Sequence, residues 1–313
     1  MSGQNSRVTD FDEFSFLPDQ AAEAGLTVPI PRGERLTLTL PDGRTLSAVR
    51  YGGSAPEVTL LHGAGLNAHT WDTTILALGR PALAIDLAGH GDSSWRDDAA
   101  YTPRNLAPDV VAALSEWTDR PQVLVGQSLG GLTAAPVAAS APDAVSRLLI
   151  VDITPGVDPD AGPTQVRTFF AGPTDWASRD ELVDRALAFG LGGGSREKAA
   201  RGVFLNSRVR ADGRVEWKHH FAHLAAAAAN DAGGTPSRDD AVTALLSGAG
   251  WDDLAAVRAP ITLIRGERGY VTEADAAEFA RRVPAARTLT FASGHNVQED
   301  APVELARAIA DLL

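Results

Sequence analysis

The chain has 313 residues, of which 44% are hydrophobic and 22% charged, and its formal net charge is −12 at pH 7. A surface this acidic repels phosphate backbones, which excludes nucleic acid as an expected partner. The sequence contains no cysteine, and this excludes disulfides, a catalytic thiol and cysteine-ligated metal sites.

Residues 1–34 are predicted to form an N-terminal extension of mixed character, which ends in prolines and a glycine. The first part of this extension is polar and acidic and lacks the apolar core of a signal peptide. No run of about 18 apolar residues occurs elsewhere in the chain, so we expect no membrane span. The sequence therefore favours a soluble, cytoplasmic protein.

Regular patterns begin with a predicted β-hairpin. Residues Leu36–Leu40 alternate between apolar and polar, Pro41–Arg44 has the composition of a turn, and Thr45–Tyr51 returns as the second strand. Later apolar runs do not alternate, which is typical of strands buried on both faces of a mostly parallel sheet. These strands are predicted at Val58–Leu61, Ala82–Leu87, Gln122–Val125, Arg147–Ile153, Ile261–Arg265 and Thr288–Phe291.

Helical patterns alternate with these strands, which predicts a doubly wound α/β sheet covered on both sides. The alternation stops after Ile153 and resumes at Ile261. Because a compact domain rarely carries so long a structureless loop, we interpret residues 155–250 as a mostly helical inserted cap. Residues 35–154 and 251–313 then form the core. Helices are predicted at Asn67–Leu78, Pro103–Thr118, Leu129–Ser140, Glu273–Val283 and Pro302–Leu313. In the cap they are predicted at Ser178–Phe189 and, within the alanine-rich segment Phe221–Ala229, at the run Ala225–Ala229.

The sharpest motif is the GQSLG sequence of residues Gly126–Gly130. It follows a predicted buried strand and precedes a helix rich in small residues. In that context G-x-S-x-G indicates a nucleophile elbow, in which the serine occupies a tight, strained turn and the flanking glycines remove side chains that would clash. The motif makes Ser128 the candidate nucleophile.

A second motif, His62-Gly63-Ala64-Gly65, follows the predicted strand Val58–Leu61. Backbone N–H groups on a glycine-rich turn after a strand can point at a developing oxyanion. In a serine acyl-transfer site we expect the donors to be the backbone N–H groups of Ala64 and of Leu129, the residue after the serine.

A third motif, Ser293-Gly294-His295-Asn296, comes directly after the last predicted strand. A histidine on a loop at the carboxyl end of a strand can reach a serine on a neighbouring strand. His295 is therefore the candidate general base, which takes the serine proton and later returns it to the leaving group.

Four segments together resemble the α/β-hydrolase fold, in its capped, serine hydrolase or esterase-like form. They are His62-Gly63, Asp86–Ser93, Gly126–Gly130 and Gly294-His295. The Asp86–Ser93 segment is similar to the D-x-x-G-H-G-x-S stretch that closes one side of the pocket in that superfamily. The resemblance implies a mostly parallel, eight-stranded sheet with an inserted helical cap, and a chain order of serine, acid and histidine. The superfamily hosts many reactions, so the fold alone does not name one.

The acid departs from the commonest pattern of that superfamily. Many relatives carry an Asp three residues after a glycine that follows the seventh strand, and Gly269 occupies that place here. A smaller set of relatives carries the acid after the sixth strand, where this chain has Asp152. We favour Asp152 as the triad acid, with Glu267 as the alternative. A turn-forming aspartate before Pro155 is the competing interpretation of Asp152.

The resemblance implies a serine hydrolase that cleaves a carboxylic ester or lactone through an acyl-enzyme intermediate. A second hypothesis is C–C bond hydrolysis of a β-diketone or ring-cleavage product. Such enzymes often use a basic cap residue for a substrate carboxylate. A third hypothesis is a non-catalytic homologue that binds a ligand in the same pocket. The basic cap residues available for the second hypothesis are Arg167, Arg179, Arg201 and Arg208.

We expect neither a metal nor another cofactor. His219 and His223 have helical i,i+4 spacing, but no carboxylate is placed as a third ligand. The glycines at 192–194 lack the Lys-Ser/Thr of a phosphate-binding loop. The expected partner is a small-molecule substrate with a hydrophobic group, because the cap carries apolar residues, while the oligomeric state stays open. Those apolar residues are Phe169, Phe170, Leu187 and Phe204.

Overall fold

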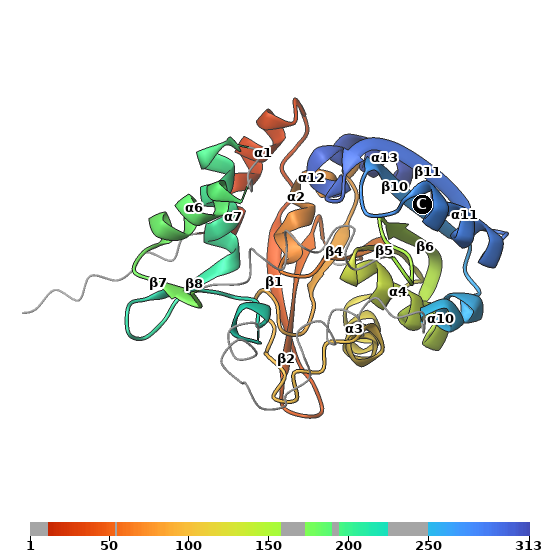
Figure 1. The fold of residues 1–313 in the computed structure, drawn as a ribbon, viewed down its shortest axis with the longest axis horizontal. Helices are drawn as coiled ribbons and strands as arrows, with labels where there is room; N and C mark the ends of the chain where they lie inside the picture. The colour runs from red at the N-terminus through yellow and green to blue at the C-terminus, as the bar shows by residue number, and fades with distance from the viewer. Residues whose placement is uncertain (1–11, 54, 158–172, 190–193, 225–249) are drawn as a thin grey trace, which may run out of the picture.

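The computed structural model describes residues 12–53, 55–157, 173–189, 194–224 and 250–313 (Figure 1). Its main sheet is eight-stranded, with the order β1-β2-β4-β3-β5-β6-β10-β11. β2 pairs antiparallel with β1 and β4, and every other pairing is parallel. The predicted fold class is confirmed. The strands are β1 (Gly33–Thr39), β2 (Thr45–Tyr51), β3 (Val58–Leu61), β4 (Ala82–Asp86), β5 (Gln122–Gln127), β6 (Val145–Val151), β10 (Ile261–Arg268) and β11 (Arg287–Gly294).

The strand boundaries differ from the predicted ones mainly at the carboxyl ends. β5, β10 and β11 each continue through a glycine or polar residue beyond the apolar run. At two of these glycines the backbones approach closely, since a Cβ on Gly266 would lie 2.3 Å from the Gly294 carbonyl oxygen. β6 instead ends at Val151, because Asp152 leaves the extended conformation with a φ of 49°. These carboxyl ends lie side by side at one edge of the sheet.

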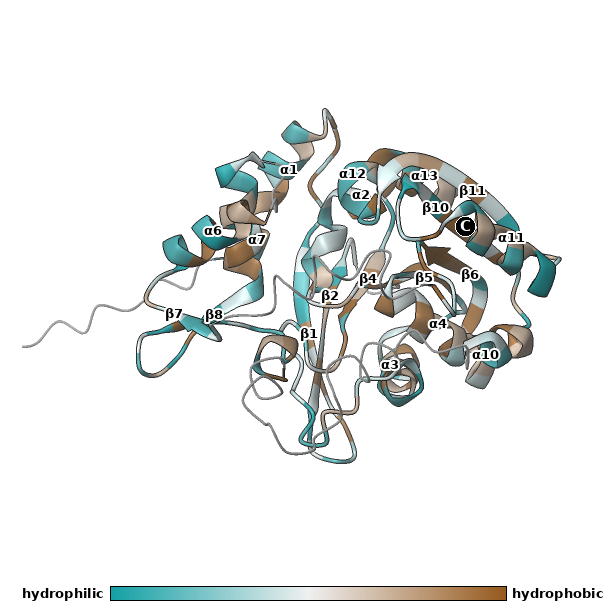
Figure 2. Cartoon of the chain, in the orientation of Figure 1, coloured by the Kyte–Doolittle hydropathy of each residue, from teal (hydrophilic) through white to brown (hydrophobic). Residues whose placement is uncertain are grey.

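Helices cover both faces of the sheet, and their apolar sides pack on it (Figures 1 and 2). On one face, Leu106, Ala134 and Phe279 bury their side chains among the strands. On the other, Leu17, Ile75 and Leu305 do the same. The first face carries α3 (Pro103–Trp117), α4 (Leu129–Ser140), α10 (Gly250–Ala256) and α11 (Glu273–Arg282); the second carries α1 (Leu17–Glu23), α2 (Asp72–Leu78) and α13 (Pro302–Ala310), and α12 (Val297–Asp300) follows β11.

Part of the predicted N-terminal extension belongs to the core. A short 3₁₀ helix, Glu13–Phe16, leads into α1, and Leu17 is only 1% exposed. The ring of Phe14 lies directly over Gly33, where a Cβ would come within 2.2 Å of it. β1 also begins inside the predicted extension, at Gly33. From Asp12 onward, the extension therefore packs against the sheet and α2.

The described part of the segment predicted to form the cap, which we continue to call the cap, contains both helices and a small sheet. Helices α6 (Arg179–Ala188) and α7 (Arg196–Asn206) pack on a three-stranded antiparallel sheet of order β7-β9-β8. The mostly helical prediction is therefore incomplete, because these strands are too short to produce a readable alternation. The helix predicted for the run Ala225–Ala229 lies outside the described residues. The cap strands are β7 (Asp175–Trp176), β8 (Ser207–Val209) and β9 (Val215–Trp217).

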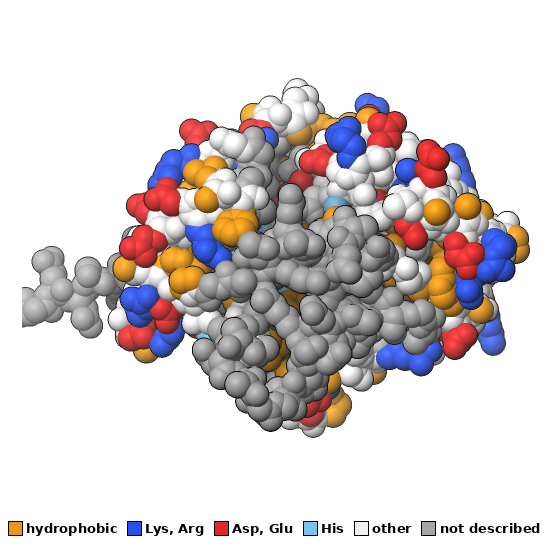
Figure 3. All heavy atoms as spheres, viewed as in Figure 1, with side chains coloured by type: hydrophobic (Ala, Val, Ile, Leu, Met, Phe, Trp, Pro, Cys, Tyr) orange, Lys and Arg blue, Asp and Glu red, His pale blue; other side chains and the backbone are white. Residues whose placement is uncertain are grey.

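The surface carries both signs of charge. In the view of Figure 3, acidic and basic side chains are interspersed over the described parts of the cap and core rather than gathered by sign. Many of them form ion pairs, such as Arg80 with Glu57 and Arg281 with Glu278. Within the described ranges, no helix has both the length and the apolar character needed to cross a membrane.

Candidate active site

Ser128 occupies the sharp turn between β5 and α4. Its φ of 53° and ψ of −120° lie in a region that non-glycine residues rarely adopt. The neighbouring glycines allow this turn, since a Cβ on Gly126 would lie 2.3 Å from the Gly130 carbonyl and one on Gly130 would lie 2.3 Å from that of Leu61. The Ser128 N–H donates to the Val151 carbonyl at 3.1 Å. The backbone is therefore held in a strained form that lifts the hydroxyl from the end of the strand.

Two backbone segments flank the serine. Leu129 is the first residue of α4, and the first N–H groups of a helix have no acceptor within it and carry its positive dipole end. On the other side lies the segment Gly63–Asn67, which we call the oxyanion loop after the role predicted for the Ala64 N–H. A Cβ added to Gly63 would lie 3.2 Å from the Cβ of Ser128, so this loop passes directly beside Ser128. The N–H groups of Ala64 and Leu129 thus belong to segments that adjoin Ser128 from two sides.

His62 fixes the start of the oxyanion loop. Its Nε2 accepts a hydrogen bond from the Leu87 N–H at 3.0 Å, so the ring proton resides on Nδ1, which donates to the Gly63 carbonyl at 2.8 Å. Burial lowers the pKa of His62 to about 4 and keeps the ring neutral at pH 7. His62 is therefore a buried link between β4 and the loop, not a second base.

Asp152 and His295 form a hydrogen-bonded pair. His295 Nδ1 lies 2.8 Å from Asp152 Oδ2, and the Asp152 side chain is fully buried. The backbone N–H groups of Gly266 and Tyr270 also donate to this carboxylate, at 2.9 and 2.6 Å. A buried carboxylate fixed by three donors is suited to hold the imidazole in one tautomer. These partners are distant in the chain, which differs from the local turn considered for Asp152.

Gly269 leaves space for the carboxylate of Asp152, the predicted acid after β6. A Cβ at position 269 would lie 2.2 Å from both carboxylate oxygens of Asp152. A side chain at position 269, where many relatives carry the acid, would therefore collide with the Asp152 carboxylate. Glu267, the alternative acid, is exposed at the end of β10, and the described hydrogen bonds and ion pairs of His295 do not include it.

The His295 ring and its loop have further supports. The ring of Tyr270 stacks on the imidazole with centroids 3.6 Å apart. Gln127, the residue before the serine, donates from Nε2 to the His295 carbonyl at 3.2 Å, and the Gly294 N–H donates to Asp300. Among the described residues, no hydrogen bond joins the Ser128 hydroxyl to His295. The structure thus brings the acid and histidine into contact and places the serine on the adjacent strand end.

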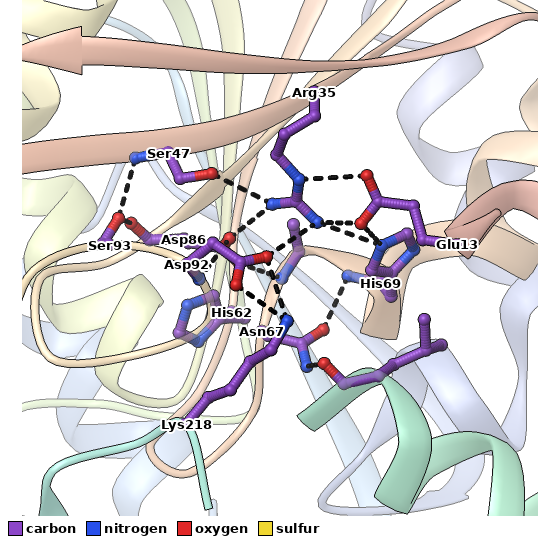
Figure 4. A network of polar contacts seen from close by, with 12 residues as sticks. Glu13, Arg35, Ser47, His62, Asn67, His69, Asp86, Asp92, Ser93 and Lys218 are labelled. Carbon is purple, nitrogen blue, oxygen red and sulfur yellow. Dashed lines mark hydrogen bonds and ion pairs between the residues drawn. The ribbon is translucent and has the colours of Figure 1, made fainter. Parts of the chain in front are cut away.

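A polar network anchors the far end of the oxyanion loop (Figure 4). The buried Asp86 accepts from the Ala68 N–H at 2.7 Å and from Arg35 at 2.6 Å. The other side of the Arg35 guanidinium pairs with Glu13 of the N-terminal segment. The D-x-x-G-H-G-x-S stretch therefore begins with a carboxylate that braces the loop next to the serine.

Sequence reasoning missed several of these supporting residues. Gln127 stands inside the GQSLG motif, so its position gave a signal that its side chain would lie near the site. Tyr270 follows Gly269, and Arg35 directly precedes the predicted hairpin, but nothing in their spacing connects them to His295 or Asp86. Only the fold brings these segments together, across separations of 25 and 51 residues.

The cap histidines contact aromatic rings. His220 stacks on Trp95 with ring centroids 4.4 Å apart, and its Nδ1 bonds the Tyr101 hydroxyl at 2.7 Å. His223 Nε2 lies 3.3 Å from Glu216. Over the described ranges, no group of three or more histidine, aspartate or glutamate side chains is arranged to hold a metal ion.

The sequence model described as "Alpha/beta hydrolase family" matches residues 60–308, which include Ser128, Asp152 and His295. The chain belongs to the α/β-hydrolase family. Among its curated relatives, this α/β-hydrolase is 38% identical to "Esterase Rv0045c" of Mycobacterium tuberculosis, over 98% of each chain. It is 27% identical to the mouse "sn-1-specific diacylglycerol lipase ABHD11", over 82% of this chain and 81% of the relative.

Solved structures agree with this family. A structure of the esterase Rv0045c superposes on this α/β-hydrolase with a TM-score of 0.79 at 37% identity, covering 97% of this chain and 99% of the other. The crystal structure of E-2-(acetamidomethylene)succinate hydrolase has a TM-score of 0.75 at 21% identity, covering 90% and 99%. The second likeness shows the shared fold, whereas the first extends to the sequence along nearly the whole chain.

Proposed function

We propose that this α/β-hydrolase cleaves carboxylic esters through an acyl-enzyme formed on Ser128. The observation that carries the proposal is the buried Asp152–His295 pair at 2.8 Å, beside a serine held at a positive φ. Full-length similarity to an esterase supports the reaction class. A strained serine, a fixed imidazole and backbone donors are the parts that acyl transfer needs.

In the proposed reaction, His295 takes the proton of Ser128 as the oxygen attacks the ester carbonyl. The ester oxygen becomes an oxyanion, which the N–H groups of Ala64 and Leu129 stabilise. Collapse of this intermediate breaks the bond to the alkoxy group, and the imidazolium returns its proton to the leaving alcohol. Water then attacks the acyl-enzyme with His295 as base, which releases the carboxylic acid and restores Ser128. Asp152 orients the ring and stabilises its charge throughout.

The cap is proposed to bind the substrate's hydrophobic group. In the described cap, Phe204 contacts Phe16 with ring centroids 5.7 Å apart, and Leu187 packs against the cap core. Phe169 and Phe170 lie outside the described residues. A cytoplasmic location stays a prediction from the polar N-terminal sequence.

The C–C hydrolase hypothesis needs a cap arginine free to bind a substrate carboxylate. Arg201 pairs with Glu23, and Arg208 pairs with Glu216. Arg179 donates to the Ser207 hydroxyl and lies over the ring of Phe204. Arg167 is outside the described residues. Two of the four arginines are therefore held in ion pairs and a third by a hydrogen bond and a ring contact. A keto-acid substrate belongs in the assay panel as a competing outcome.

The experiment combines a covalent probe with a substrate panel. The protein is treated with a fluorophosphonate, and the adduct is located by peptide mass spectrometry beside a Ser128→Ala control. We expect one adduct, on Ser128, together with turnover of p-nitrophenyl and aliphatic esters. Turnover of dienoic keto-acids with little turnover of esters would favour the C–C hydrolase. A folded protein that neither reacts with the probe nor turns over any panel member would favour a binding protein.

A further inference from the structure

Two asparagine side chains cross between the cap and the oxyanion loop. Asn206, the last residue of α7, donates from Nδ2 to the Gly65 carbonyl at 2.6 Å. Asn67, at the other end of the loop, donates from its own Nδ2 to the Leu205 carbonyl at 3.2 Å. Figure 4 shows Asn67 between the Asp86 network and the end of α7. The end of this cap helix is thus bonded to the loop that carries the Ala64 N–H.

Two peptide planes connect the Gly65 carbonyl, which Asn206 binds, to the Ala64 N–H. Asn206 fixes the Gly65 carbonyl, and the Leu66 N–H belongs to the same planar peptide group. That N–H donates to the Gly63 carbonyl at 3.2 Å, closing a turn in which Gly65 has a φ of 76°. The Gly63 carbonyl shares its plane with the Ala64 N–H, which points to the opposite side.

The core fixes the other groups that orient this turn. The His62 ring donates to the same Gly63 carbonyl, and Asp86 accepts from Ala68 just beyond the loop. Both side chains are buried, and both belong to the rigid sheet or its edge. Asn206 differs because it comes from the cap. The Ala64 N–H is therefore oriented by core groups together with the Asn206 bond, and the Asn206 bond exists only when the end of α7 lies against the loop.

We propose that Asn206 is a positioning residue that couples the seating of the cap to the geometry of the oxyanion hole. This inference rests on the proposed ester hydrolysis. It adds that the end of α7 must lie against the oxyanion loop for the chemical step, not only for holding the substrate. Loss of the bond releases the Gly65–Leu66 peptide, weakens the hold on the Gly63 carbonyl and lets the Ala64 N–H turn away from the oxyanion. The effect falls on the transition state, where the negative charge develops.

Other bonds between the cap and the rest of the molecule supply a matched control. Arg201 of α7 pairs with Glu23 of α1 at 2.9 Å. This pair is also a cap contact, yet it ends on the N-terminal helix rather than on the oxyanion loop. Removing it tests cap attachment alone, whereas changing Asn206 tests the attachment to Gly65.

The test compares Asn206→Asp and Asn206→Ala with Glu23→Gln in the full chain. Aspartate keeps the shape of asparagine but, when ionised, cannot donate to the Gly65 carbonyl. For a p-nitrophenyl ester we expect kcat to fall about 10- to 100-fold in both Asn206 variants, with KM within about threefold. The affinity for a trifluoromethyl ketone, which forms an oxyanion adduct with the serine, should fall by a similar factor. Glu23→Gln should leave both quantities unchanged.

Three outcomes would overturn the proposal. An unchanged kcat in both Asn206 variants would show that the Gly65 bond does not affect the oxyanion hole. A raised KM with normal kcat would assign Asn206 to substrate binding only. Loss of folded structure in both variants, measured by circular dichroism, would make the residue structural. Absence of ester turnover in the unmodified protein would instead contradict the proposed function, and so the two failures are distinguishable.

Discussion

Different kinds of contact hold the cap and the strand-end site, by which we mean Ser128, Asp152 and His295 at the carboxyl ends of the strands. At the strand ends, Asp152 is fully buried and accepts three hydrogen bonds from distant segments. In the cap, the contacts to the rest of the molecule include the partly exposed pair Arg201–Glu23 and the two asparagine bonds at the end of α7. Buried and multiply bonded groups resist displacement, whereas exposed pairs contribute little. The difference lies between a buried carboxylate with three hydrogen bonds and a cap whose contacts include a partly exposed ion pair.

The largest expected effect separates the two candidate acids. Asp152→Asn should lower kcat/KM about 10³- to 10⁴-fold, because the amide can donate to Nδ1 and favour the wrong imidazole tautomer. Glu267→Gln should change kcat/KM less than about threefold, since its side chain is exposed. The measurement is steady-state ester hydrolysis by both variants. A severe loss in Glu267→Gln alone would reverse the assignment.

The next largest loss of activity is expected when the Asp152 carboxylate is crowded. Gly269→Ala places a Cβ 2.2 Å from the carboxylate oxygens, so the carboxylate or the β10–α11 loop must move. We expect an activity loss of about 10- to 100-fold and a stability loss of about 1–3 kcal/mol. Gly202→Ala is the matched control, because nothing lies within 4 Å of its Cβ and alanine favours the helix by about 0.5–1 kcal/mol. Normal activity in Gly269→Ala would refute the crowding argument.

Some features of this site could be predicted from the sequence, and others could not. The unalternating apolar runs and the GQSLG motif predicted the sheet and the position of Ser128, because burial on both faces leaves a direct compositional signal. Asp152 followed from a family resemblance together with the glycine at 269. The bond from Asn206 to Gly65 could not be predicted, because it joins residues 141 positions apart and depends on how the cap lies on the core. The short cap strands also lack a readable period.

A third prediction concerns a buried charged group at the N-terminal side of the core. Burial lowers the pKa of His69, but the Asp72 carboxylate and a bond to Glu13 raise it more strongly, to about 9. Because this value lies above the ordinary one near 6.5, the stabilisation is complete below about pH 6.5 and is lost as pH rises through 9. We expect the stability difference between the unmodified protein and His69→Gln to shrink by about 1–3 kcal/mol from pH 6 to pH 10. Thermal unfolding across that range measures it, and a constant difference would contradict the shift.

The smallest effect is expected in the cap. Glu23→Gln breaks the pair with Arg201, whose side chains are 32% and 15% exposed, and should lower stability by at most about 1 kcal/mol. High salt should reduce even this difference, because screening weakens exposed pairs. Chemical denaturation at low and high salt measures it. A loss of several kcal/mol would mean that the cap is attached as firmly as the strand-end site, and the contrast between the two regions would not hold.

The central claim is that Ser128 forms the acyl-enzyme. The most direct test is rapid-quench mass spectrometry of the protein mixed with a p-nitrophenyl ester, followed by peptide mapping beside Ser128→Ala. We predict that the acyl group appears on Ser128 within the first turnover, decays as the free acid is released, and is absent from the variant. Steady turnover with no acylated peptide, or with the acyl group on another residue, would contradict the account.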